Sequence, residues 1–224
     1  FSIIMATTQG KNLLTGNNIM QILGQSSVKL FYTLGVAGLI LLAGTDLSIG
    51  RMTGLGASFV NMLLSTTVYT SALGFAIDIT GAPIAIKVIL AILMSVVLCT
   101  IFSAIAGFFS AKFKMHPFIT TLSTQLLIFG LMQINYSSVA AFTMDSSVRN
   151  ALRGESYLNI IIMAIIAVII VWFIWNKTRF GKNMYAVGGN AEAASVSGIS
   201  VFWTTMGVFI LAGVLYGFGG YATA

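Results

Sequence analysis

The chain has 224 residues, of which 58% are hydrophobic and 7% are charged, and its formal net charge is +6. Soluble domains carry about 25% charged residues, so this composition excludes a water-soluble fold and predicts an integral membrane protein. The apolar runs are continuous and long enough to cross a bilayer as helices, which excludes the ~10-residue alternating strands of an outer-membrane barrel. We therefore expect an all-α fold, a polytopic membrane helix bundle.

The apolar runs follow one another with short polar breaks. Residues 1–5 read as the end of a truncated helix, and a polar segment at 6–27 follows them. Six runs then predict six membrane spans, at 28–43, 52–70, 88–111, 118–136, 157–175 and 201–224. We interpret 1–224 as a single transmembrane domain and expect it to be a fragment of a longer protein, truncated at both ends.

The break at 44–51 (GTDLSIGR) places an acidic residue, Asp46, beside an apolar run. Ionisable groups at such places are costly and often functional. Ser48 is a candidate helix cap, and Arg51 is an available ion-pair partner. Two interpretations stay open. The first is a broken membrane helix whose freed backbone groups line a cavity or cap the next segment, and the second is an interfacial turn held by an Asp–Arg pair.

Other polar residues lie inside predicted spans, at Asn61, Gln125 and Gln133. They could line a translocation path, or they could hydrogen-bond to neighbouring helices. The sequence has no Gly-x-x-x-x-Gly-Lys-Ser/Thr motif, one cysteine and one histidine. We therefore expect no ATP binding by that route, no metal, no cofactor and no enzymatic activity in this chain.

Basic residues gather in two short turns. Lys112 and Lys114 lie in one, and Lys177, Arg179 and Lys182 lie in the other. Two predicted spans separate these turns, so they lie on the same side, which the positive-inside rule makes cytoplasmic. We assign the excess basic charge to topology and not to nucleic acid, because no basic patch interleaves with aromatic residues.

The basic loop at 176–200 is the only long polar segment whose sequence predicts a helix. Asn190 is a good N-cap, and Glu192 places negative charge in the first turn. Alanines follow, and Gly198 is where such a helix would end in a left-handed conformation. We expect a short capped helix on the cytoplasmic face, with a surface of small residues suited to docking into another protein.

Three segments resemble the permease subunits of bacterial ABC importers for monosaccharides, the ribose/xylose/galactoside permease family. They are 44–51, 116–124 (HPFITTLST) and 178–199. The first of them, together with the run WNKTRFGKN at 175–183, is more similar to the galactose/methyl-galactoside members than to the ribose members. One departure is Ser123, where the family usually has glycine.

The resemblance also assigns roles. Glu192, Ala193, Ala194 and Gly198 match the family's Glu-Ala-Ala-x-x-x-Gly coupling motif, and Asn190 begins the same helix. It implies a permease homodimer in the bacterial inner membrane, two cytoplasmic ATPase subunits and an extracytoplasmic sugar-binding protein. The helix would sit in a groove of the ATPase, which would carry out the hydrolysis.

A second class of function remains open, an ion-coupled secondary transporter or channel without an ATPase. Its expected sign is ionisable residues within spans that bind an ion or relay protons. In this interpretation Asp46 is the one such residue near a span, which disfavours proton coupling.

Overall fold

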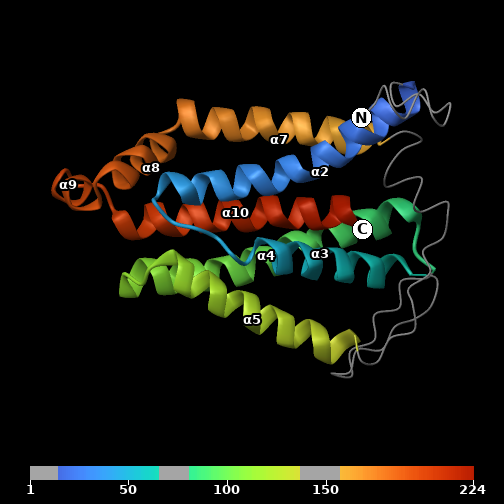
Figure 1. Ribbon diagram of the computed structural model, residues 1–224, viewed down its shortest axis with the longest axis horizontal. Helices are drawn as coiled ribbons and strands as arrows, with labels where there is room; N and C mark the ends of the chain where they lie inside the picture. Colours follow the sequence, from blue (N-terminus) through green and yellow to red (C-terminus); the bar gives the residue numbers. More distant parts are fainter. Residues whose placement is uncertain (1–14, 66–80, 137–156) are drawn as a thin grey trace, which may run out of the picture.

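A computed structural model describes residues 15–65, 81–136 and 157–224, which form eight helices. In chain order these are α2 (Gly16–Leu41), α3 (Ile49–Leu64), α4 (Ile84–Phe113), α5 (Pro117–Tyr136), α7 (Leu158–Lys177), α8 (Arg179–Gly189), α9 (Ala191–Val196) and α10 (Val201–Thr223). Six of them run lengthwise through one bundle, and α8 and α9 extend from one end of it (Figure 1). The all-α helix bundle expected from the composition is confirmed.

Each predicted span coincides with one helix of the bundle, with shifted boundaries. Four described helices, α4, α5, α7 and α10, are long and apolar enough to cross a membrane. The helix α3 has 16 residues, and α2 starts at Gly16, well before the predicted residue 28, because its polar first turns are exposed and do not interrupt the helix. The predicted helix end at 1–5 and loop at 137–156 lie outside the described residues.

The helix α10 occupies the middle of the bundle (Figure 1). It lies against α4 at glycines, because a Cβ atom added to Gly213 would lie 2.7 Å from the Cα atom of Thr100. Ser95 and Ser103 of α4 donate hydrogen bonds to carbonyl oxygens of α10, at 2.8 and 2.6 Å. Small residues and short polar side chains at a close helix contact are typical of packing within a membrane.

The two basic turns lie at the same end of the bundle, as the sequence predicts. One joins α4 to α5 and the other joins α7 to α8, both on the left in Figure 1. We call this the basic end, defined by the exposed residues Lys112, Lys114, Lys177, Arg179 and Lys182. Both α8 and α9 belong to it.

Candidate functional site

The segment 42–48, which we call the link, joins α2 to α3 without being helical. Helix α2 ends with Ala43 in the left-handed region (φ 55°) and with a bond from the Gly44 N–H to the Leu39 carbonyl, at 3.0 Å. The link then turns back into the bundle, so that α3 begins about midway along it (Figure 1). Half-length helices that begin inside a bundle are a feature of transporter folds.

Burial alternates along the link, as it does in an extended strand. Gly44, Asp46 and Ser48 are buried, whereas the residues between them, Ala43, Thr45 and Leu47, are exposed. This periodicity of two explains the spacing Gly-x-Asp-x-Ser in the sequence, because it turns Gly44 and the side chains of Asp46 and Ser48 toward the bundle.

Asp46 joins the link to α10. Its side chain is 7% exposed, and its Oδ1 atom accepts bonds from the N–H and the hydroxyl of Ser48, at 2.8 and 2.6 Å. Its Oδ2 atom accepts a bond from the hydroxyl of Tyr216, at 2.7 Å. A buried carboxyl group is tolerated when its oxygens are hydrogen-bonded in this way. Ser48 does stand at the N-cap position of α3, but its side chain makes no capping bond there.

The ion pair between Asp46 and Arg51, which belongs to the second interpretation, does not form among the described residues. Arg51 is exposed, and its guanidinium lies over the ring of Phe129 on α5, 4.4 Å from the centroid. Asp46 faces α10, whereas Arg51, in the first turn of α3, faces α5. Of the two interpretations of 44–51, the structure has the break between helices and lacks the turn held by an ion pair.

The start of α5 packs on the link. The hydroxyl of Thr121 accepts a bond from the N–H of Leu47 at 3.2 Å and lies 3.4 Å from the carbonyl oxygen of Thr45. A Cβ atom on Gly44 would lie 2.8 Å from the Cγ atom of Pro117. Two of the three segments that carry the family resemblance, 44–51 and 116–124, are therefore in contact.

The third segment contains a helix that the sequence interpretation treated as loop. Residues 179–189 form α8, which begins where the Thr178 side chain accepts a bond from the Gly181 N–H. Met184 and Val187 are buried, at 0% and 6% exposure, and hold α8 against the bundle. Gly188 lies so close to the carbonyl of Leu41 that no Cβ atom fits. The end of α8 is thus fixed to the end of α2, where the link begins.

The predicted capped helix is α9. Asn190 accepts a bond from the Ala193 N–H at 2.9 Å, and Gly198 has a φ of 82°. The Ile199 N–H bonds to the Ala194 carbonyl and the Gly198 N–H to the Ser195 carbonyl, both at 3.0 Å, which together form a Schellman motif. Both ends predicted from the sequence are confirmed in geometry.

Helix α9 forms the tip of the basic end (Figure 1). Ala194 is 5% exposed and faces inward, whereas Asn190, Glu192, Ala193 and Gly198 are exposed. Sequence reasoning missed Val196, an apolar side chain that is 90% exposed. The signal that could have found it is its position one helical turn after Glu192, which puts both residues on one face of the helix.

The polar residues predicted inside spans do not form a common site. Asn61 and Gln125 are half-buried and Gln133 is exposed. None of their side chains hydrogen-bonds within the described part of the chain, and none lines the pocket between α2, α3, α7 and α10. A path formed by these residues together stays a prediction.

Comparison with known proteins decides the family. A family model described as "Branched-chain amino acid transport system / permease component" matches residues 18–224. The chain belongs to this permease family. The galactose/methyl galactoside import permease protein of Treponema pallidum (strain Nichols) is 50% identical over 98% of this chain and 44% of its own length. The corresponding Escherichia coli (strain K12) permease is 39% identical over 92% of this chain and 62% of its own length.

The D-allose transport system permease protein of Escherichia coli (strain K12) is 31% identical over 97% of this chain and 62% of its own length. The chain therefore spans 44 to 62% of the length of these three permeases. No solved structure matches the chain. The resemblance to sugar importer permeases, and within them to galactoside members, is confirmed.

Proposed function

We propose that the chain belongs to the permease subunit of an ATP-driven importer for a monosaccharide, such as galactose or methyl galactoside. In this proposal it forms part of the translocation path, and a separate subunit hydrolyses ATP. The observation that carries the proposal is α9, a helix capped at both ends that presents Glu192 and Val196 at the tip of the basic end. An exposed apolar side chain with charge beside it is suited to a protein interface.

The names of the matched proteins bear on the substrate. The description of the family names branched-chain amino acid transport, whereas the relatives at 50, 39 and 31% identity are named for galactosides and allose. We give the relatives more weight, because each is named for a particular substrate and is at least 31% identical to this chain. The proposed cargo is therefore a sugar.

The proposed surroundings follow from this function. The partners are a second permease copy in a homodimer, a cytoplasmic ABC ATPase and an extracytoplasmic sugar-binding protein, with no nucleic acid. The proposed location is the bacterial inner membrane as a multi-pass protein, with lipid against the exposed apolar faces of α4, α5 and α7. The basic end then faces the cytoplasm.

The contacts indicate how coupling would work. Motion of the ATPase at α9 would move α8, to which α9 is joined directly at Asn190. Gly188 of α8 lies against Leu41, so that displacement would reach the end of α2 and the link. Asp46 bonds the link to Tyr216 on α10. A rigid capped helix, a non-helical link and a central helix together form a continuous physical connection from the tip to the bundle.

The alternative, ion coupling without an ATPase, needs an ionisable group able to hold an ion. Asp46 accepts three hydrogen bonds from Ser48 and Tyr216, and they occupy both carboxyl oxygens. It therefore serves as a connection between elements, which favours the ATP-driven mechanism.

The proposal predicts that Glu192→Lys and Gly198→Trp, made in the full-length protein, uncouple ATP hydrolysis from uptake. Each changes the exposed surface of α9, and no described atom lies within 4 Å of a Cβ atom at Gly198. We expect sugar uptake to fall at least about tenfold, which corresponds to ~1.4 kcal/mol of lost coupling. Membrane insertion should remain normal. Radiolabelled sugar uptake and ATPase rate in proteoliposomes measure this.

Two variants separate coupling from local stability. Gly198→Ala introduces the strain of a left-handed alanine without bulk, and Glu192→Gln removes the charge but keeps the helix. Both should retain more uptake than the two disruptive variants. Uptake at the wild-type level with Glu192→Lys and Gly198→Trp would refute the assignment of α9.

A further inference from the structure

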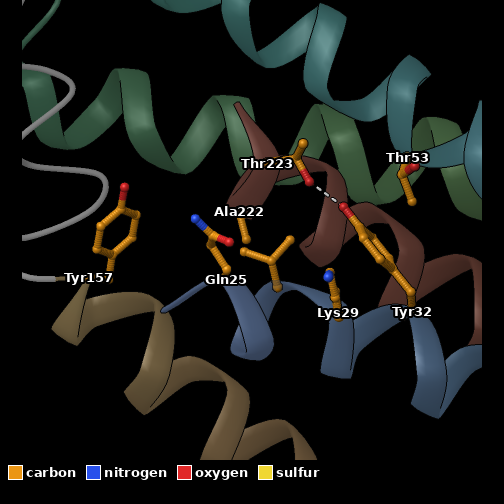
Figure 2. A pocket seen from close by; sticks show the side chains of 8 residues that line it. Gln25, Lys29, Tyr32, Thr53, Tyr157, Ala222 and Thr223 are labelled. Atoms are coloured by element: carbon orange, nitrogen blue, oxygen red, sulfur yellow. Dashed lines mark hydrogen bonds between the residues drawn. The ribbon is translucent and has the colours of Figure 1, made fainter. Parts of the chain in front are cut away.

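A pocket of about 450 Å³ lies between α2, α3, α7 and α10. Its lining includes the start of α7 and the last residue of α10, and these helix ends lie at the opposite end of the bundle from α9 (Figure 1). Small-molecule sites have volumes of roughly 300–1,000 Å³, so a monosaccharide is within its capacity. Its lining includes Gln25, Lys29 and Tyr32 of α2, Thr53 of α3 and Tyr157 at the start of α7. Figure 2 shows these side chains together with Thr223 of α10.

One wall of the pocket is fixed by hydrogen bonds. The hydroxyls of Tyr32 and Thr223 each lie 2.8 Å from the Gly219 carbonyl oxygen and also contact each other, so one of them donates to the carbonyl and the other donates to its neighbouring hydroxyl. These bonds hold the aromatic face of Tyr32 in place between α2 and α10 (Figure 2). A preorganised wall lowers the cost of binding a ligand.

Two other side chains of α2 at the pocket make no such hydrogen bonds. Gln25 and Lys29 are exposed, and neither side chain hydrogen-bonds or ion-pairs within the described parts of the chain. They offer an amide with two donors and one acceptor, and an ammonium with three donors. Lys29 lies inside the predicted apolar run 28–43, so the view that Asp46 is the one ionisable residue near a span was incomplete. Ionisable residues within such segments mark substrate pathways.

The chemistry of the lining selects the ligand class. Free donors and an acceptor beside aromatic rings match a sugar, whose hydroxyl groups bond at their edges and whose C–H faces pack on rings. The lining contains one cation and, among its described residues, no acidic group, so it repels metal and sodium ions. Lys29 therefore does not support the ion-coupled alternative.

We propose that this pocket binds a neutral monosaccharide, with Gln25 and Lys29 donating to its hydroxyl groups and Tyr32 packing on its face. The inference deepens the proposed function and rests on it, because the pocket would receive the sugar at the end of the bundle away from the ATPase. It adds binding residues that neither the sequence pattern nor the family motifs indicate.

The test is equilibrium binding of radiolabelled methyl galactoside to the purified full-length permease in detergent. Gln25→Leu and Lys29→Met each remove hydrogen-bond donors at exposed positions, so we expect the protein to fold normally. Each should weaken binding about tenfold, the ratio that ~1.4 kcal/mol produces. Gln21→Leu is the matched control, because Gln21 is exposed on α2 and does not line the pocket.

Two results would overturn the pocket assignment. One is binding by Gln25→Leu and Lys29→Met that equals the wild type. The other is stronger Lys29-dependent binding of galacturonate than of methyl galactoside, which would make it an anion site. Co-purification with the ATPase, measured on the same samples, reports on the proposed function separately, since none of these residues lies near α9.

Discussion

Gly213→Leu is expected to destabilise the bundle at its centre. A Cβ atom at Gly213 would already lie 2.7 Å from the Thr100 Cα and 2.8 Å from the Ser103 Cβ, so a leucine side chain forces α10 away from α4. Overpacking of this kind costs about 1–3 kcal/mol, which corresponds to a fall of roughly 3–10 °C in the midpoint of thermal unfolding. The midpoint is measured on the detergent-purified full-length protein.

The matched control is Gly130→Leu on α5. Gly130 is also within a helix, but it is exposed, and no described atom lies within 4 Å of a Cβ atom placed there. Leucine has a higher helix propensity than glycine, so the midpoint should stay the same or rise slightly. Equal midpoints for the two variants would contradict the close approach of α10 and α4.

Asp46→Leu is expected to be the most damaging single change in the link. It removes the acceptor of three hydrogen bonds and leaves the N–H and hydroxyl of Ser48 and the hydroxyl of Tyr216 without their partner. Each unsatisfied buried group costs about 1–3 kcal/mol, so we expect a total loss of ~3 kcal/mol or more. The same thermal measurement applies, and uptake should be lost with it.

Two conservative variants test whether hydrogen bonding is the cause. Asp46→Asn keeps an oxygen acceptor for Ser48, and Tyr216→Phe removes a single bond, so each should cost about 1 kcal/mol. If Asp46→Leu leaves the midpoint of thermal unfolding unchanged, the carboxyl group does not hold the link to α10. A loss with Asp46→Asn as large as with Asp46→Leu would instead assign the effect to charge.

The correct predictions rest on local features of the sequence. The cap at Asn190 and the left-handed end at Gly198 depend on bonds within a few residues, so the sequence suffices to predict α9. The helical spans follow from the lengths of apolar runs. Helix α8 was not predicted, although Phe180, Met184 and Val187 recur at helical spacing, because the segment is basic and rich in glycine and was interpreted as a loop.

Non-local contacts account for the rest. The sequence marks Asp46 as unusual and offers Arg51 only as a possible partner, whereas its actual long-range partner, Tyr216, lies 170 positions away. The contact between the link and Thr121 is of the same kind. Lys29 was overlooked because it interrupts an apolar run only once, and its place beside Gln25 and Tyr32 depends on the packing of α2 against α10.

The central claim is that α9 docks into an ATPase, and co-purification tests it most directly. We would express the full-length permease with its candidate ATPase, solubilise the membranes in mild detergent and follow elution of the two proteins. Val196→Asp, which places a charge at the most exposed apolar side chain of α9, and Gly198→Trp are the variants. The account predicts co-elution with the wild type and its loss with both variants, whereas co-elution unaffected by them, or absent from the wild type, would contradict it.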